Sequence, residues 1–172
     1  AAEDPHWLVR HNAAQQTKKD ALKQRIAYQE AGRQRAREGS IIHLKACMLY
    51  WGEGAKGRNN LQFTNTDPHM LRLFMRFLRQ EFNVSDSNIY LRIMHHTKDK
   101  QEINRIESYW LDWLNLSSDC TVKMQVKEGT KSRKTRYQNG ICAIGVSSTE
   151  IQHHIFGAIQ EYLGFDNPDW LK

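Results

Sequence analysis

The stretch CMLYWGEGAKGRNN, residues 47–60, joins a run of apolar side chains to one carboxylate and then to a basic, amide-rich segment. The apolar run starts at Ile41 and puts large side chains on nearly every side of a helix, which predicts a helix over 41–52 buried between other elements. Glu53 follows, between two glycines. Because the C-terminus of a helix disfavours an acid, we expect Glu53 to be aimed at a charged partner, with a plain solvated carboxylate as the alternative.

Length and composition favour one domain with a core of its own, since the chain has 172 residues and is 40% hydrophobic. No apolar run approaches the ~20 residues that cross a bilayer, and no signal-peptide pattern is present, so we expect an intracellular, cytoplasmic protein without membrane contact. Cys47, Cys120 and Cys142 are widely spaced and are interpreted as reduced core residues, not as a disulfide framework or zinc site.

The net charge of +6 favours an anionic partner, most commonly nucleic acid, with plain solubility as the alternative. The cations are concentrated. Residues 127–136 hold five of them against Glu128 alone, which predicts a phosphate-binding loop. Residues 13–38 are basic, rich in helix formers and poor in large apolar residues, and predict a long solvated helix ending at Gly39. This helix is either a connector or a surface that lies along phosphate.

The remaining pattern predicts an α/β (α+β) fold, with a mostly antiparallel curved sheet backed by helices. Alternating residues predict strands, and a basic loop joins the last two as a long hairpin. Asp67 before Pro68, and Ser147 with Glu150 as a capping box, predict two helix starts. The expected strands cover 61–66, 88–96, 120–127 and 136–147, and the expected helices cover 68–82, 100–116 and 147–163.

The domain organisation follows from these elements. We expect an N-terminal helical extension or linker over 1–39, a main domain over 40–165 and a tail over 166–172. The segments YWGEG (50–54) and YWLDW (109–113) each place an acid two residues after Tyr-Trp. This echo suggests two related halves, about 41–98 and 100–163, although chance similarity between amphipathic segments would produce it too.

The segment ACMLYWGEG (46–54) resembles the motif helix of the LAGLIDADG homing-endonuclease family, with Glu53-Gly54 as its final acidic-glycine pair. The order of helix, strand, turn, helix and strand downstream is also similar to that family. The sequence departs at Met48, where a small residue is expected, and at Trp51, where the motif has its first acid. The resemblance implies sequence-specific binding of double-stranded DNA, with magnesium-dependent endonuclease activity. Some relatives are regulators that keep the fold and bind DNA without cutting it.

Phosphodiester hydrolysis requires a divalent cation to activate water and offset the developing charge, and Mg²⁺ prefers one or two carboxylates. We expect Glu53 and Asp112 to be the catalytic metal ligands, in a monomer with pseudo-twofold symmetry. The alternative is a homodimer that supplies a second Glu53. The residues expected where the helices meet are Met48, Trp51, Gly52, Gly54 and Trp110.

The polar faces of the strands are expected to contact DNA, since two-stranded ribbons fit the major groove. The same alternation occurs in any solvated sheet, and a third interpretation is a domain that binds only protein. His95-His96 and His153-His154 are interpreted as surface or groove residues, because neighbours on a strand point to opposite faces. The candidate DNA contacts are Lys56, Arg58, Asn60, Gln62, Thr64, Arg92, Lys123, Gln125, Lys127, Lys131, Arg133, Lys134 and Arg136.

Overall fold

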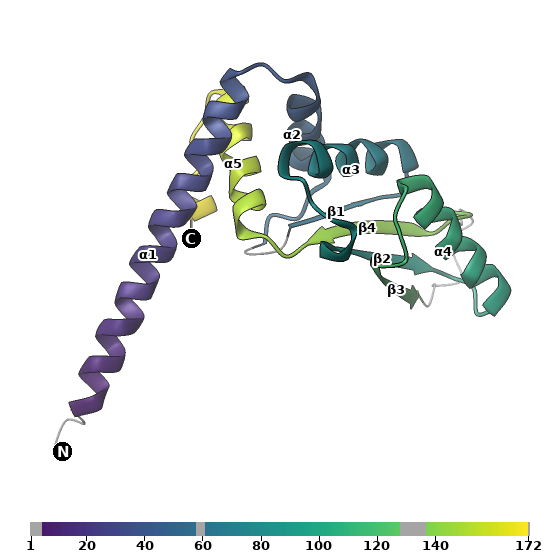
Figure 1. Cartoon of the computed structure of the whole chain (residues 1–172), viewed down its shortest axis with the longest axis horizontal. Helices are drawn as coiled ribbons and strands as arrows, with labels where there is room; N and C mark the ends of the chain where they lie inside the picture. The colour runs from purple at the N-terminus through teal and green to yellow at the C-terminus, as the bar shows by residue number, and fades with distance from the viewer. Residues whose placement is uncertain (1–4, 58–60, 128–136, 172) are drawn as a thin grey trace.

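The computed structural model describes residues 5–57, 61–127 and 137–171, which form a mixed α/β fold (Figure 1). The predicted fold class is confirmed at this level. The elements are α1 (Pro5–Arg37), α2 (Ile41–Glu53), β1 (Leu61–Asn65), α3 (Pro68–Phe82), the short 3-10 helix η1 (Asp86–Asn88), β2 (Ile89–His95), α4 (Lys100–Leu114), β3 (Thr121–Val126), β4 (Ile141–Val146), α5 (Thr149–Leu163) and the 3-10 helix η2 (Pro168–Leu171).

The four strands form one mixed sheet in the order β1-β4-β2-β3. β4 pairs antiparallel with both β1 and β2, whereas β3 pairs parallel with β2. The prediction of a long hairpin between the last two strands is therefore wrong, because β2 lies between β3 and β4. The parallel pair follows from α4, since a helical crossover returns the chain in the same direction.

The two faces of the sheet differ in chemistry. On the core face, Leu61, Phe63, Leu91, Ile93 and Ile144 are almost completely buried beneath the helices. The opposite face, which we call the open face, carries the alternate residues of each strand. Its members are Gln62, Thr64, Tyr90, Arg92, Met94, Thr121, Lys123, Gln125, Ile141, Ala143 and Gly145.

Local signals fix most helix boundaries. Asp67 caps α3 by accepting a hydrogen bond from the His69 N–H at 2.8 Å, as predicted. Asn83 and Asn115 end α3 and α4 in the left-handed conformation. The cap of α5 is Ser148, not Ser147, and its side chain accepts from the Ile151 N–H.

Helix α1 begins at Pro5, earlier than the predicted start, and its C-terminal part packs along α5 (Figure 1). The two helices approach closely where Gly32 faces the His154 carbonyl and Gly157 faces the Gln29 carbonyl. A Cβ at either glycine would overlap that backbone. Small residues at the crossing therefore let α1 dock on the domain.

Helix α2 is covered on one side only. Its buried side chains, including Cys47 and Tyr50, face α3, α5 and β1. The other side forms the α2 stripe, which consists of Ile41, Leu44, Met48 and Trp51; Ile41 is 69% and Trp51 47% exposed. The expectation of a helix buried on all sides is thus wrong for this stripe.

The two halves of the domain differ in element order. The first runs helix, strand, helix, strand, whereas the second runs helix, strand, strand, helix. This order gives no support to the predicted relation between 41–98 and 100–163. All three cysteines are free and buried, as expected for reduced core residues.

Candidate nucleic-acid interface and acidic helix exit

The open face carries two neighbouring cations near its centre. Arg92 on β2 lies beside Lys123 on β3 in the register of the sheet, and neither side chain has a hydrogen bond or ion pair with any described residue. Like charges on neighbouring strands repel each other. All four strands lack an acidic residue, so nothing in them offsets this repulsion.

Two of the three open-face residues of β4, Ala143 and Gly145, are small. Ala143 lies between Thr64 and Arg92, and Gly145 lies between Gln62 and Tyr90. The Tyr90 ring lies over Gly145 of β4, so closely that a Cβ on Gly145 would overlap the ring. Longer side chains on β1 and β2 therefore border a lower central strand.

Of the seven predicted DNA contacts that lie in the described residues, five fall on this face. Gln62, Thr64, Arg92, Lys123 and Gln125 share it, and the Gln62 amide donates to the Thr64 hydroxyl at 3.0 Å. Lys127 follows β3 and is exposed. Arg58, Asn60, Lys131, Arg133, Lys134 and Arg136 lie outside the described residues.

Glu53 is the last residue of α2 and its side chain is exposed. The turn that follows is held by backbone-directed hydrogen bonds. Gly54 forms an antiparallel bridge with Phe63, and the Ala55 N–H donates to the Gln62 carbonyl at 2.8 Å. The Tyr50 hydroxyl donates to the Ala55 carbonyl. The carboxylate is thus carried on a fixed turn at edge strand β1.

Lys56 caps the end of α2. Its ammonium donates to the carbonyls of Tyr50 and Gly54, at 2.9 and 2.6 Å, and lies over the Tyr50 ring. A cation here offsets the partial negative charge of the helix C-terminus. Desolvation lowers the pKa of Lys56, while the nearby Glu53 raises it. Lys56 therefore has a structural role at the end of α2, and its contact with DNA stays a prediction.

Asp112 is not paired with Glu53 in the fold. It is exposed on α4, whose main contacts are with α3 and β3, whereas α2 mainly contacts α3, α5 and β1. Figure 1 shows α3 between α2 and α4. The intramolecular metal pair is therefore not formed. Among the described residues, no group of three or more His, Cys, Asp or Glu side chains could hold a metal ion.

The residues predicted at a helix interface have separate roles. Trp110 is buried on α4 and donates to the Asn139 carbonyl at 2.7 Å, away from α2. Gly54 meets the Tyr50 ring, whereas Gly52 faces open space. Met48 lines an apolar groove of about 510 Å³ between α2 and α3. Trp51, on the exposed stripe, does not pack where two halves meet.

A buried histidine pair was missed by the sequence analysis. His43 on α2 and His154 on α5 place their Nε2 atoms 3.0 Å apart, and the His43 Nδ1 is 2.7 Å from the Tyr162 hydroxyl. Burial lowers the pKa of both histidines, that of His154 to about 4. Nearby, Glu81 forms two hydrogen bonds with Arg35, which lower the pKa of its carboxyl group.

The other predicted histidine positions also need correction. His95 and His153 are each only 2% exposed, so the interpretation of both histidine dipeptides as surface or groove residues holds only for His96. The His153 Nδ1 lies 3.4 Å from the Gln29 amide in the seam between α1 and α5. The signal available in the sequence was the apolar spacing around these histidines, which places them on buried faces.

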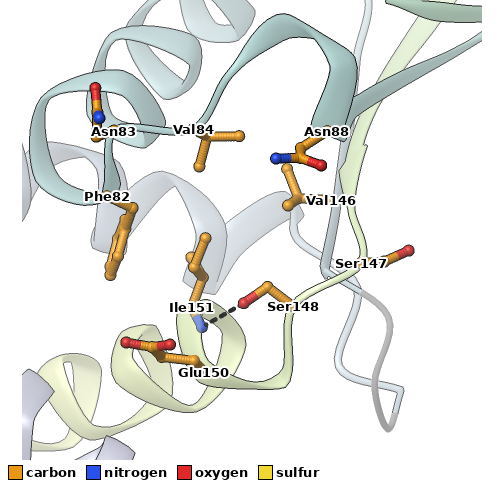
Figure 2. A pocket seen from close by; sticks show the side chains of 9 residues that line it. All are labelled: Phe82, Asn83, Val84, Asn88, Val146, Ser147, Ser148, Glu150 and Ile151. Atoms are coloured by element: carbon orange, nitrogen blue, oxygen red, sulfur yellow. Dashed lines mark hydrogen bonds between the residues drawn. The ribbon is translucent and has the colours of Figure 1, made fainter.

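A hollow of about 370 Å³ lies between the end of α3, η1, the end of β4 and the start of α5 (Figure 2). Its buried lining residues, Val146 and Ile151, are apolar. Asn83, Asn88 and Glu150 are exposed at its rim. The Ser148 hydroxyl is already occupied by the Ile151 N–H (Figure 2). The hollow therefore lacks the convergent buried polar groups of a ligand site.

Comparisons with protein-family models, with curated proteins and with solved structures give no match. Any function must therefore be argued from the site itself. Among the described helices, none combines the length and apolar character needed to cross a membrane.

Proposed function

We propose that this chain binds double-stranded DNA through the open face of its sheet, on a scaffold similar to the LAGLIDADG homing endonucleases. The observation that carries the proposal is the adjacent pair Arg92 and Lys123, which lack an acidic partner among the described residues. Two neighbouring unpaired cations destabilise the isolated sheet, and a polyanion offsets that cost.

The remaining residues of the open face suit a duplex. Amide side chains recognise adenine in the major groove and guanidinium groups recognise guanine. Gln62 and Gln125 lie on opposite edge strands with Arg92 between them. A strand surface can enter the major groove, where these side chains reach base edges while Lys123 contacts phosphate.

The order of elements supports the family resemblance. Helix α2 ends at Glu53, and the Gly54 that follows it bridges to Phe63 of β1. β1, the Asp67 turn, α3 and β2 then follow in the implied order.

Binding is tested by fluorescence anisotropy with labelled duplexes, using Arg92→Gln/Lys123→Gln. Loss of the Lys123 phosphate contact lowers the slope of log affinity against log salt by about 0.9, and loss of the Arg92 base contact weakens binding further. The matched control, Arg72→Gln/Arg76→Gln, removes the same charge from exposed positions of α3. Equal affinity of the two double variants would contradict the proposal, as would salt-insensitive binding by the unmodified protein.

Magnesium-dependent phosphodiester cleavage is a second candidate, favoured by the placement of Glu53 on a fixed turn at the end of α2. One exposed carboxylate suits Mg²⁺, which keeps several positions for water and phosphate. Bound at Glu53, the ion would activate water and offset phosphate charge. Because Asp112 is elsewhere, the second acid must come from another copy, and the α2 stripe is an apolar surface suited to that contact.

Cleavage is tested by incubating DNA libraries with Mg²⁺ and either the unmodified protein or Glu53→Gln. Specific cutting that the variant loses supports the nuclease. DNA binding without cutting by the unmodified protein supports instead a regulator on the same scaffold. The variant keeps the exposed shape of the side chain and should bind DNA as the unmodified protein does, so a loss of binding would contradict the assigned role.

A further inference from the structure

The N-terminal part of α1, residues 5–24, is called the arm. Every side chain from Val9 to Asp20 is exposed, and the first buried residue after Val9 is Arg25. Figure 1 shows the arm running downward and away from the rest of the domain, whereas α2 and α3 lie above the sheet. The arm thus points away from the helices that cover the core face. Its 20 residues span about 30 Å.

The charges of α1 divide sharply along its length. In the docked part, each exposed or half-buried arginine has a carboxylate partner: Arg33 pairs with Asp166, Arg35 with Glu81 and Arg37 with Glu161. These pairs neutralise the helix where it lies against the domain.

In the arm, Lys18, Lys19 and Lys23 are exposed and form no hydrogen bond or ion pair with a described residue. The one acid of the arm, Asp20, accepts a hydrogen bond from the Gln16 amide at 2.9 Å. Lys19 and Lys23 are one turn apart on the same face, where like charges cost a few tenths of a kcal/mol. An anionic partner would relieve that repulsion.

The pattern of the arm does not suit a second helix as its partner. Its exposed large apolar residues, Trp7, Val9 and Leu22, do not recur at the spacing of three and four residues that makes an apolar stripe. Trp7 is instead stacked on His11 at 5.0 Å between ring centroids. Charge, and not apolar area, is what the arm offers.

We propose that the arm contacts the phosphate backbone of the same duplex that the open face binds, beyond the part of the duplex lying on the sheet. This inference rests on the proposed function, since it extends the same interface. An arm of about 30 Å reaches along about nine base pairs. The three lysines act as point charges on phosphate and carry no base specificity.

The test compares Lys18→Gln/Lys19→Gln/Lys23→Gln with Arg72→Gln/Arg76→Gln/Lys100→Gln, which removes the same charge from exposed positions on α3 and α4. Anisotropy is measured across a salt series with duplexes of about 10 and about 30 base pairs. On the longer duplex the arm variant binds about tenfold or more weakly, and its salt slope falls by about 2.7. On the shorter duplex it matches the unmodified protein, and far-ultraviolet circular dichroism shows the same helix content.

The outcomes separate the two proposals. If Arg92→Gln/Lys123→Gln weakens binding to both duplexes and the arm variant binds the longer one normally, the arm proposal is overturned and the open face stands. An equal loss in the arm variant and the charge-matched control also overturns it. Retention of anionic phospholipid vesicles that depends on the lysines, without any effect on DNA, assigns the arm to a membrane surface instead. Absence of DNA binding by the unmodified protein overturns both proposals.

Discussion

Replacing His154 by glutamine should remove most of the acid sensitivity of folding. The Nε2 atoms of His43 and His154 lie 3.0 Å apart, so one donates a hydrogen and the other accepts it. If both rings were protonated, two N–H groups would face each other in a buried site. Glutamine places an amide nitrogen near the position of Nε2, and can keep a hydrogen bond to His43 without titrating.

The magnitude follows from the pKa of His154, which burial and the neighbouring His43 lower to about 4. An unfolded histidine titrates near ~6.5, so between these values the unfolded chain binds a proton that the folded chain does not. Stability is present above the unfolded pKa and is lost as pH falls. For His154 alone, the loss between about pH 7 and about pH 5 is about 2 kcal/mol, and His43 shifts in the same direction.

Urea unfolding at both pH values measures this difference for the unmodified protein, His154→Gln and the control His11→Gln, in which an exposed histidine is changed. Arginine pairing lowers the pKa of Glu81, so its contribution is lost as pH falls from the ordinary carboxyl pKa to the lowered one, which is below the chosen window. The chosen window therefore isolates the histidines. The reasoning is refuted if His154→Gln loses as much stability as the unmodified protein.

Two further predictions concern α2. Gly54→Ala should destabilise the fold by about 1–3 kcal/mol in urea unfolding, because the new Cβ overlaps the Tyr50 ring. Gly52 is a helical residue whose Cβ would meet no other atom, so Gly52→Ala should be neutral or stabilising by about 0.5–1 kcal/mol. Equal effects of the two substitutions would contradict this reasoning. Leu44→Glu on the α2 stripe should lower self-association in sedimentation velocity. Ile26→Glu, which changes a more exposed apolar residue on α1, should not.

Local signals predicted most elements because short-range chemistry decides them. The Asp67-Pro68 pair sets the start of α3 through a cap and a fixed backbone angle. Alternation along 89–95 placed Leu91 and Ile93 on the core face and Arg92 on the open face. The polar residues of the candidate interface were therefore predictable one strand at a time.

Partners across the fold were not predictable in the same way. The alternation of side chains predicts that 121–126 and 141–146 are strands, but it does not predict which strand each one pairs with. The sequence did offer one indication: α4 follows β2 and precedes β3 in the chain, and strands joined by a helix commonly pair in parallel. Likewise, the apolar composition of 41–52 does not say whether each side is covered by the same chain. The structure leaves the α2 stripe exposed.

The histidine pair shows the limit of sequence reasoning most clearly. His43 and His154 are 111 residues apart, and they meet only because α2 and α5 pack together. The predicted pairing of Asp112 with Glu53 is wrong because a similarity between two short segments does not determine how their helices pack. The echo between YWGEG and YWLDW is a likeness of sequence only, because α4 packs mainly against α3 and β3, whereas α2 packs mainly against α3, α5 and β1.

The position of Glu53 makes binding and cleavage separable. Glu53-Gly54 adjoins edge strand β1, and Lys123 lies on the other edge, β3, three strand spacings or about 14 Å away. One copy can thus bind a duplex while its single acid lies at one edge. The α2 stripe belongs to the same helix as Glu53, so a copy docked there brings a second Glu53 to that side.

If two copies supply the acids, the rate of cutting should rise with the square of protein concentration below dimer saturation. The amount of a short duplex that is bound should instead rise in direct proportion to protein concentration. Leu44→Glu should abolish cutting and leave the affinity for that duplex unchanged, because Leu44 lies on the α2 stripe and not on the open face. Cleavage rates measured over a dilution series check both statements. A rate proportional to protein concentration, unaffected by Leu44→Glu, would show that a single copy holds the complete site.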